Sequence, residues 1–198
     1  MTVIVKADII ADVNDNLAIS LSGTDLDRQI IKTLTDMSNR GLLVDADDSQ
    51  TLVDGGTTLD YPTGFRSVIN ITLIDSSGAE KYPLTKFPGG HKEYRELRAN
   101  DDATGTVEYF SEFNKKFYLW RPAGESFTTL IEYRKNHAKD ADNIEFETEF
   151  ESLMFAGVTF WYAVKLNRTK SIALWLPIYD REMRFAMLNR NNQPSIIT

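Results

Sequence analysis

The feature that most constrains the fold of this chain is a change of hydrophobic period along its length. Near both ends, apolar residues recur every three or four positions, which is the spacing of amphipathic helices. In the middle, short runs alternate apolar and polar residues and are separated by Gly, Asn, Asp and Pro, as in a series of β-hairpins. This order predicts a helical unit that carries a β-rich insertion.

Two helices are predicted at the N-terminus. Residues 6–18 place Ile9, Val13 and Leu17 on one helical face. A second amphipathic segment follows and ends at Gly41, because glycine readily adopts the left-handed conformation found after a helix. These two segments are expected to pack as antiparallel helices.

The middle of the chain predicts short strands joined by local turns. Turns such as Asp54-Gly55-Gly56 and the segment 75–78 favour hairpins between consecutive strands. Residues 86–105 have the composition of a loop, with at most a helical turn at 93–97. The predicted strands cover residues 51–53, 57–61, 66–75, 80–85, 106–112, 116–121 and 126–134.

The last third of the chain is helical again. A long central helix is predicted over residues 144–166, whose apolar surface is wide and whose first turn is acidic, as suits the positive end of the helix dipole. The following helical segment, 172–188, contains Pro177, which removes a backbone hydrogen bond, so one or two helical pieces are expected. The tail at 189–198 has no core to join but carries two isoleucines, Ile196 and Ile197, near its end.

Together these patterns predict an α+β fold. We expect a small helical bundle, made of two N-terminal helices, a long central helix and a C-terminal helix, with an inserted antiparallel β-hairpin subdomain. The expected parts are residues 1–48 and 139–188 for the bundle, 49–138 for the β subdomain, and 189–198 for an extended C-terminal tail.

Charge is unevenly distributed along the chain. Residues 1–60 hold 11 Asp, no Glu and four Lys or Arg, so this part alone accounts for a net charge of −7. A purely acidic run follows at 140–151, and residues 165–190 are basic. Such separation suits subunits that pack side by side, acidic surface against basic surface, although solvated faces are the simpler explanation for any one charge. A basic stripe interleaved with aromatics is missing, so we expect no sequence-specific nucleic-acid binding.

The sequence offers little catalytic or metal-binding chemistry. It has no cysteine, and its two histidines, His91 and His137, lack the spacing of metal ligands. No apolar run is long enough to span a membrane. The best enzyme hypothesis places Glu145 and Glu149 on one helix face as the paired carboxylates of a glycoside hydrolase. We therefore predict no enzyme activity, no cofactor, no metal site and no membrane insertion, with the acidic hydrolase as the least favoured alternative.

Four successive segments resemble the head-to-tail adaptor (connector) proteins of tailed bacteriophages, and the likeness covers most of residues 6–190. The matching features are two short N-terminal helices (KADIIADVNDNL and TDLDRQIIKTLTDMSNRG), a β-rich insertion with the pairs Tyr61-Pro62 and Tyr82-Pro83, a strand pair (FYLWRPAGESFTTLIEYRKN), and an acidic long helix (EFETEFESLMFAGVTFWYAVKLNR) followed by a Tyr-led helix (YDREMRFAMLNR).

The resemblance implies a structural virion protein at the head–tail junction, made in the host cytoplasm. About a dozen copies would form a homo-oligomeric ring under the portal protein, extend the DNA channel and dock the tail. Contact with packaged DNA would be passive, because acidic surfaces repel phosphates. The candidates for partner docking are Arg190, Pro194, Ile196 and Ile197, since a tail segment can order in a partner's groove. Another phage tail or host-surface binding component is the alternative.

Overall fold

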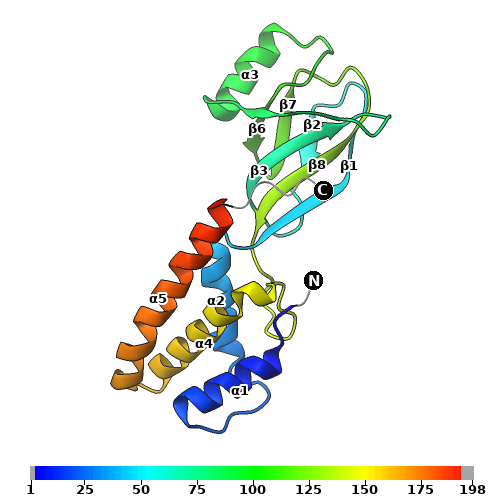
Figure 1. Cartoon of the computed structure of the whole chain (residues 1–198). Coiled ribbons are helices and arrows are strands. Elements are labelled where there is room, and N and C mark those ends of the chain that lie inside the picture. The colour runs from blue at the N-terminus through cyan, green and yellow to red at the C-terminus, as the bar shows by residue number, and fades with distance from the viewer. Residues whose placement is uncertain (1–2, 193–198) are drawn as a thin grey trace. The chain divides into compact units, whose positions relative to one another are not determined.

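The structure, a computed structural model, describes residues 3–192, with side chains described up to residue 189. The chain divides into two compact units (Figure 1). The helical unit comprises the chain up to Leu43 and from Asn136 onward, and the β unit is the continuous segment Val44–Lys135. The chain therefore leaves the helical unit once and returns to it once. The boundaries expected from the sequence were 49 and 138.

The helical unit is arranged around one central helix. Its elements are α1 (Lys6–Leu17), α2 (Asp27–Asn39), the short 3-10 helix η1 (Thr148–Phe150), α4 (Glu151–Lys165) and α5 (Thr169–Asn192). α4 contacts α1, α2 and α5. This follows from its sequence, because nine of its 15 residues are buried and they lie around most of the helix circumference.

Three helices approach one another closely at Gly157 in α4. A Cβ atom at this position would lie 2.5 Å from Thr33 Cγ2 in α2 and 2.8 Å from Tyr179 Cε2 in α5. Tyr179 is buried, and its hydroxyl donates to Asp36 Oδ2 at 2.7 Å. Burial, reinforced by the Asp36 carboxylate, raises the pKa of Tyr179. The absence of a side chain at Gly157 therefore permits both contacts of α4.

Polar contacts fix α1 at both of its ends. Ala18 follows the helix in the left-handed conformation, with φ of 49°. The guanidinium of Arg168, in the turn between α4 and α5, donates to the carbonyl oxygen of Leu17 at 2.7 Å. At the N-terminal end, Lys6 Nζ lies 2.7 Å from an Asp27 carboxylate oxygen. The Arg168 contact satisfies a carbonyl that the C-terminus of α1 leaves without an intrahelical partner, and the Lys6–Asp27 ion pair joins α1 to α2.

The β unit contains two four-stranded sheets and one helix. The first sheet has the order β1 (Val44–Leu52), β8 (Phe127–Lys135), β3 (Phe65–Ile74) and β4 (Glu80–Pro83). The second has the order β2 (Thr58–Asp60), β7 (Lys116–Trp120), β6 (Tyr109–Phe113) and β5 (Thr85–Lys86). The β5–β6 pair is parallel, and the other pairs are antiparallel. The helix α3 (Gly90–Asn100) contacts β6 and β7.

The two sheets share one apolar core. Ile71 from β3 and Ile131 from β8 are fully buried, as are Phe117 and Leu119 from β7. The ring of Phe65 meets Phe117 edge to face, with centroids 5.4 Å apart. Burial alternates along β7 and β8, because successive side chains of a strand point to opposite faces of its sheet.

The expected description of the fold, a small helical bundle with an inserted β-hairpin subdomain, is wrong. The chain is α+β, but the insertion contains two sheets with eight strands in total. Turn sequences indicate only the pairing of strands that are consecutive in the sequence. The first sheet depends instead on pairs between distant segments, such as Val44 with Arg134 in β1 and β8. Nothing local in either strand specifies such a partner.

Two helices also differ from the sequence predictions. Residues 86–105, predicted as a loop with at most a helical turn at 93–97, contain the full helix α3. Tyr94 is its one buried residue, so the apolar period is too weak to detect. α5 continues through Pro177 as a single helix. The ring of this proline prevents a hydrogen bond to the carbonyl of Ala173. Both residues are exposed, so water can solvate that carbonyl and the helix persists.

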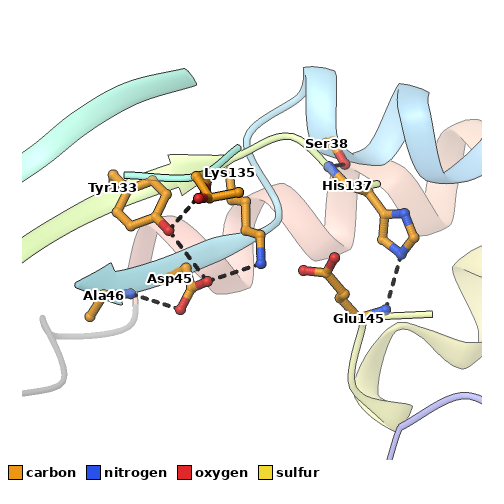
Figure 2. Close-up of polar contacts among 8 residues, drawn as sticks. Ser38, Asp45, Ala46, Tyr133, Lys135, His137 and Glu145 are labelled. Carbon is orange, nitrogen blue, oxygen red and sulfur yellow. Dashed lines mark hydrogen bonds and ion pairs between the residues drawn. The ribbon is translucent and has the colours of Figure 1, made fainter. Parts of the chain in front are cut away.

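Polar contacts in the β unit hold the two ends of the insertion together. The Tyr133 hydroxyl in β8 donates to an Asp45 carboxylate oxygen in β1 at 3.5 Å (Figure 2). Lys135 Nζ lies 3.1 Å from an Asp45 carboxylate oxygen. Because Asp45 is in β1 and Lys135 ends β8, the point where the chain enters this unit lies beside the point where it leaves.

In the helical unit, the returning chain is held by His137. Its backbone N–H donates to Ser38 Oγ at 3.1 Å, and its ring Nε2 accepts the backbone N–H of Glu145 at 3.0 Å (Figure 2). The acceptor role of Nε2 leaves the proton on Nδ1, which donates to the carbonyl of Ala138. The ring is also parallel to that of Phe146. His137 therefore has a structural role.

Candidate assembly surface

The outward side of α5 is the main apolar surface of the helical unit. Its inward side packs on the core through Trp175, Tyr179 and Met183. On the opposite side, Leu174 is 58% exposed and Phe185 is 55% exposed. We define the outer face of α5 as the residues that share this side: Lys170, Leu174, Pro177, Arg181, Arg184, Phe185 and Leu188.

The residues of the outer face are regularly spaced. Six of them, from Lys170 to Leu188, recur at alternating steps of four and three, which keeps them in one stripe along a helix. At 1.5 Å per residue the stripe is roughly 27 Å long. Its apolar members are interleaved with cations. An exposed apolar patch bordered by charges is typical of a surface that contacts another protein.

Two of the three cations on the outer face of α5 have no partner in the described part of the chain. Lys170 and Arg184 are exposed, and no carboxylate oxygen among residues 3–189 lies within 4 Å of either. Arg181 pairs with its neighbour Glu182 at 2.8 Å. Exposed pairs of this kind contribute at most about 1 kcal/mol. All three cations therefore remain available to an acidic partner.

A small cleft borders the outer face of α5 near its C-terminal end. Its volume is about 140 Å³. Small-molecule sites are commonly about 300–1,000 Å³, so this cleft is better suited to a side chain of a protein partner. It is lined by Glu149, Phe150, Ser152, Leu153, Glu182, Phe185, Ala186 and Asn189.

A second surface, of opposite charge, lies on α1. We define the acidic face of α1 as Asp8, Asp12 and Asp15, which are four and three residues apart and therefore lie on one side of the helix. Burial is the main factor that raises the pKa of Asp12, and the carboxylates of Asp15 and Glu151 add to it. The acidic face of α1 therefore repels further negative charge and favours a cationic partner.

The predicted docking residues lie at and beyond the end of α5. Arg190 belongs to this helix, but its side chain is outside the described part of the structure. Pro194, Ile196 and Ile197 also lie outside the described residues. Their role stays a prediction. The outer face of α5 leads along the chain directly into this segment.

The carboxylates considered for glycoside hydrolysis do not lie on one helix face. The helix predicted over 144–166 begins later, with η1 at Thr148 and α4 at Glu151. Glu149 is within η1, whereas Glu145 lies in the irregular segment before it. The side chains of Ile144 and Phe146 are buried on either side of Glu145, which holds this segment against the core. The geometric premise of the hydrolase hypothesis is therefore missing.

His91 belongs to an aromatic cluster of the β unit. Its Nδ1 lies 3.1 Å from Ser111 Oγ, and its ring stacks on Phe113 with centroids 4.4 Å apart. Burial, with a smaller effect of Arg95, lowers the pKa of His91. Among the described residues, no three His, Asp or Glu side chains gather in a way that could hold a metal ion.

No protein-family model matches the chain, and no curated protein matches it either. Within residues 3–192, none of the helices combines the length and the apolar character needed to cross a membrane.

Sequence reasoning missed both the outer face of α5 and the acidic face of α1. A signal for the first was present, because Lys and Arg recur together with Leu and Pro at steps of four and three. It was masked by a second apolar set, including Trp175 and Tyr179, on the same helix. With apolar residues on two sides, only packing decides which side faces α4.

Proposed function

We propose that this protein is a head-to-tail adaptor (connector) of a tailed bacteriophage. In this role about a dozen copies form a ring beneath the portal protein, extend the DNA channel and dock the tail. The order of segments over residues 6–190 supports the proposal. The structural observation that carries it is the outer face of α5, a regular apolar and basic stripe exposed to solvent. Such a surface suits lasting contact between protein subunits.

The proposed role is mechanical and needs no reacting groups. A connector has to hold its neighbours and leave the genome free to pass. A net charge of −7 supports the second requirement, since acidic surface repels the phosphates of DNA and disfavours their adhesion. The C-terminal tail supplies a segment that can order when a partner covers Ile196 and Ile197.

The decisive measurement is the native mass of a phage portal ring with and without the purified protein. We expect the mass of the ring to rise by about a dozen subunits, in line with a symmetric assembly. An unchanged portal mass, with this protein in a small oligomer of its own, would overturn the proposal in favour of a tail or host-surface component.

The docking role of the tail has a matched test. Ile196→Asp/Ile197→Asp should abolish portal binding, because charged side chains oppose burial in an apolar groove. Asn191→Asp/Asn192→Asp adds the same charge at the nearby end of α5 without removing apolar surface, and it should leave binding largely intact. Normal binding by the isoleucine variant would show that docking lies elsewhere.

A further inference from the structure

We infer that the outer face of α5 binds the acidic face of α1 on a second copy of this chain, so that copies join head to tail. This inference rests on the proposed function and names the two surfaces through which neighbouring subunits of the ring meet.

Charge selects the partner of the outer face of α5. This face carries Lys170, Arg181 and Arg184, so a symmetric contact between two α5 helices would oppose like charges. The acidic face of α1 offers three carboxylates at a similar spacing. Lys6, the one cation of α1, is already engaged by Asp27 and Asp142. A second copy can supply the missing cations.

Shape also matches the two faces. Ala7 and Ala11 are exposed beside the acidic face of α1, and such small residues let another helix approach closely. The outer face of α5 offers large exposed side chains, Leu174 and Phe185, to fill that space. Both faces repeat at seven residues, as between Asp8 and Asp15, so two helices at a shallow crossing angle stay in contact along their length.

The two surfaces can be occupied at the same time. α1 and α5 contact α4 from different sides (Figure 1). One copy can therefore give its outer face of α5 to one neighbour and its acidic face of α1 to the other. Contacts between two unlike surfaces are heterologous, and they generate a closed ring when the rotation between copies permits closure.

Exchange of charge between the two faces tests the inference. The variant Lys170→Glu/Arg184→Glu makes both faces acidic, and Asp8→Lys/Asp15→Lys makes both basic. Each variant alone should lose at least about tenfold in self-association, measured by sedimentation, because like charges oppose one another. An equal mixture of the two variants should recover self-association, since each contact between copies of different variants joins an acidic face to a basic one. A mixture that associates no better than either variant would overturn the inference.

Arg28→Glu/Lys139→Glu provides the matched control. Both residues are exposed in the helical unit and lie outside the two faces, and the control changes the net charge by the same amount as the first variant. It should associate like the unaltered chain. If it loses association as strongly, net charge is responsible and the specific contact is wrong.

The absence of cysteine from the chain permits a second test that also captures weak contacts. Ala11→Cys on isotopically labelled protein is mixed with unlabelled Leu174→Cys and treated with a short bifunctional maleimide. We expect the 11–174 adduct to exceed the 174–174 adduct by at least about tenfold, as a heterologous interface requires. A prevailing 174–174 adduct, or no intermolecular adduct with or without the portal present, would overturn the inference.

The two proposals fail in different ways. If the unaltered chain adds to the portal ring but the charge exchange gives no recovery in the mixture, the inferred surfaces are wrong and the adaptor role stands. If the mixture recovers and the 11–174 adduct prevails while the portal mass stays unchanged, the surfaces are right and the adaptor role falls.

Discussion

Gly157 allows α4 to pack closely against α2 and α5, so a substitution at this position tests that contact. Glycine to alanine within a helix ordinarily stabilises by about 1 kcal/mol. Here the added methyl would lie 2.5 Å from Thr33 Cγ2, so we expect Gly157→Ala to destabilise by about 1–3 kcal/mol in urea unfolding. Gly157→Ala/Thr33→Ser removes that methyl group and should regain part of the loss. A stabilised Gly157→Ala variant would mean that the helices are not in contact at this point.

At the scale of elements, local patterns predicted several helices and strands but not how the strands pair. The two N-terminal helices follow from a clear apolar period, and β3 and β8 follow from alternation. The sheets could not be predicted, because β1 and β8 pair across most of the insertion. The candidate surfaces could not be predicted from the sequence for a related reason. Whether an apolar side chain is exposed depends on which side of its helix packs against the core.

Pro177 lies inside α5 without breaking the helix. A proline inside a helix costs about 3 kcal/mol relative to alanine, and α5 tolerates it because the lost hydrogen bond faces solvent. Pro177→Ala restores that bond and should raise the free energy of unfolding of the helical unit by about 1–3 kcal/mol. Leu176→Ala, at an adjacent exposed position, should change it by less than about 0.5 kcal/mol. Equal effects of the two variants would contradict this account of the helix.

At the scale of the whole molecule, each unit has a core of its own, and the β unit is one continuous segment. We therefore expect residues 44–135 to fold in isolation, with the circular dichroism of a β protein and a cooperative thermal transition. Residues 1–43 and 136–198, joined by a short Gly–Ser linker, should fold as helices, because Val44 and Arg134 are paired neighbours and their ends need little chain to connect.

The fragment 49–138, cut at the boundaries that the sequence suggested, is the matched control for the isolated β unit. It lacks the first half of β1, where Val44, Asp45, Ala46 and Asp47 pair with β8. Removing these partners exposes one edge of β8 and uncovers the inner side chain of Tyr133, so this fragment should melt well below 44–135 or remain unfolded. Equal stability of the two fragments would show that the pairing of residues 44–47 with β8 contributes nothing to the fold. An unfolded 44–135 would show that the β unit depends on the helices that flank it in sequence.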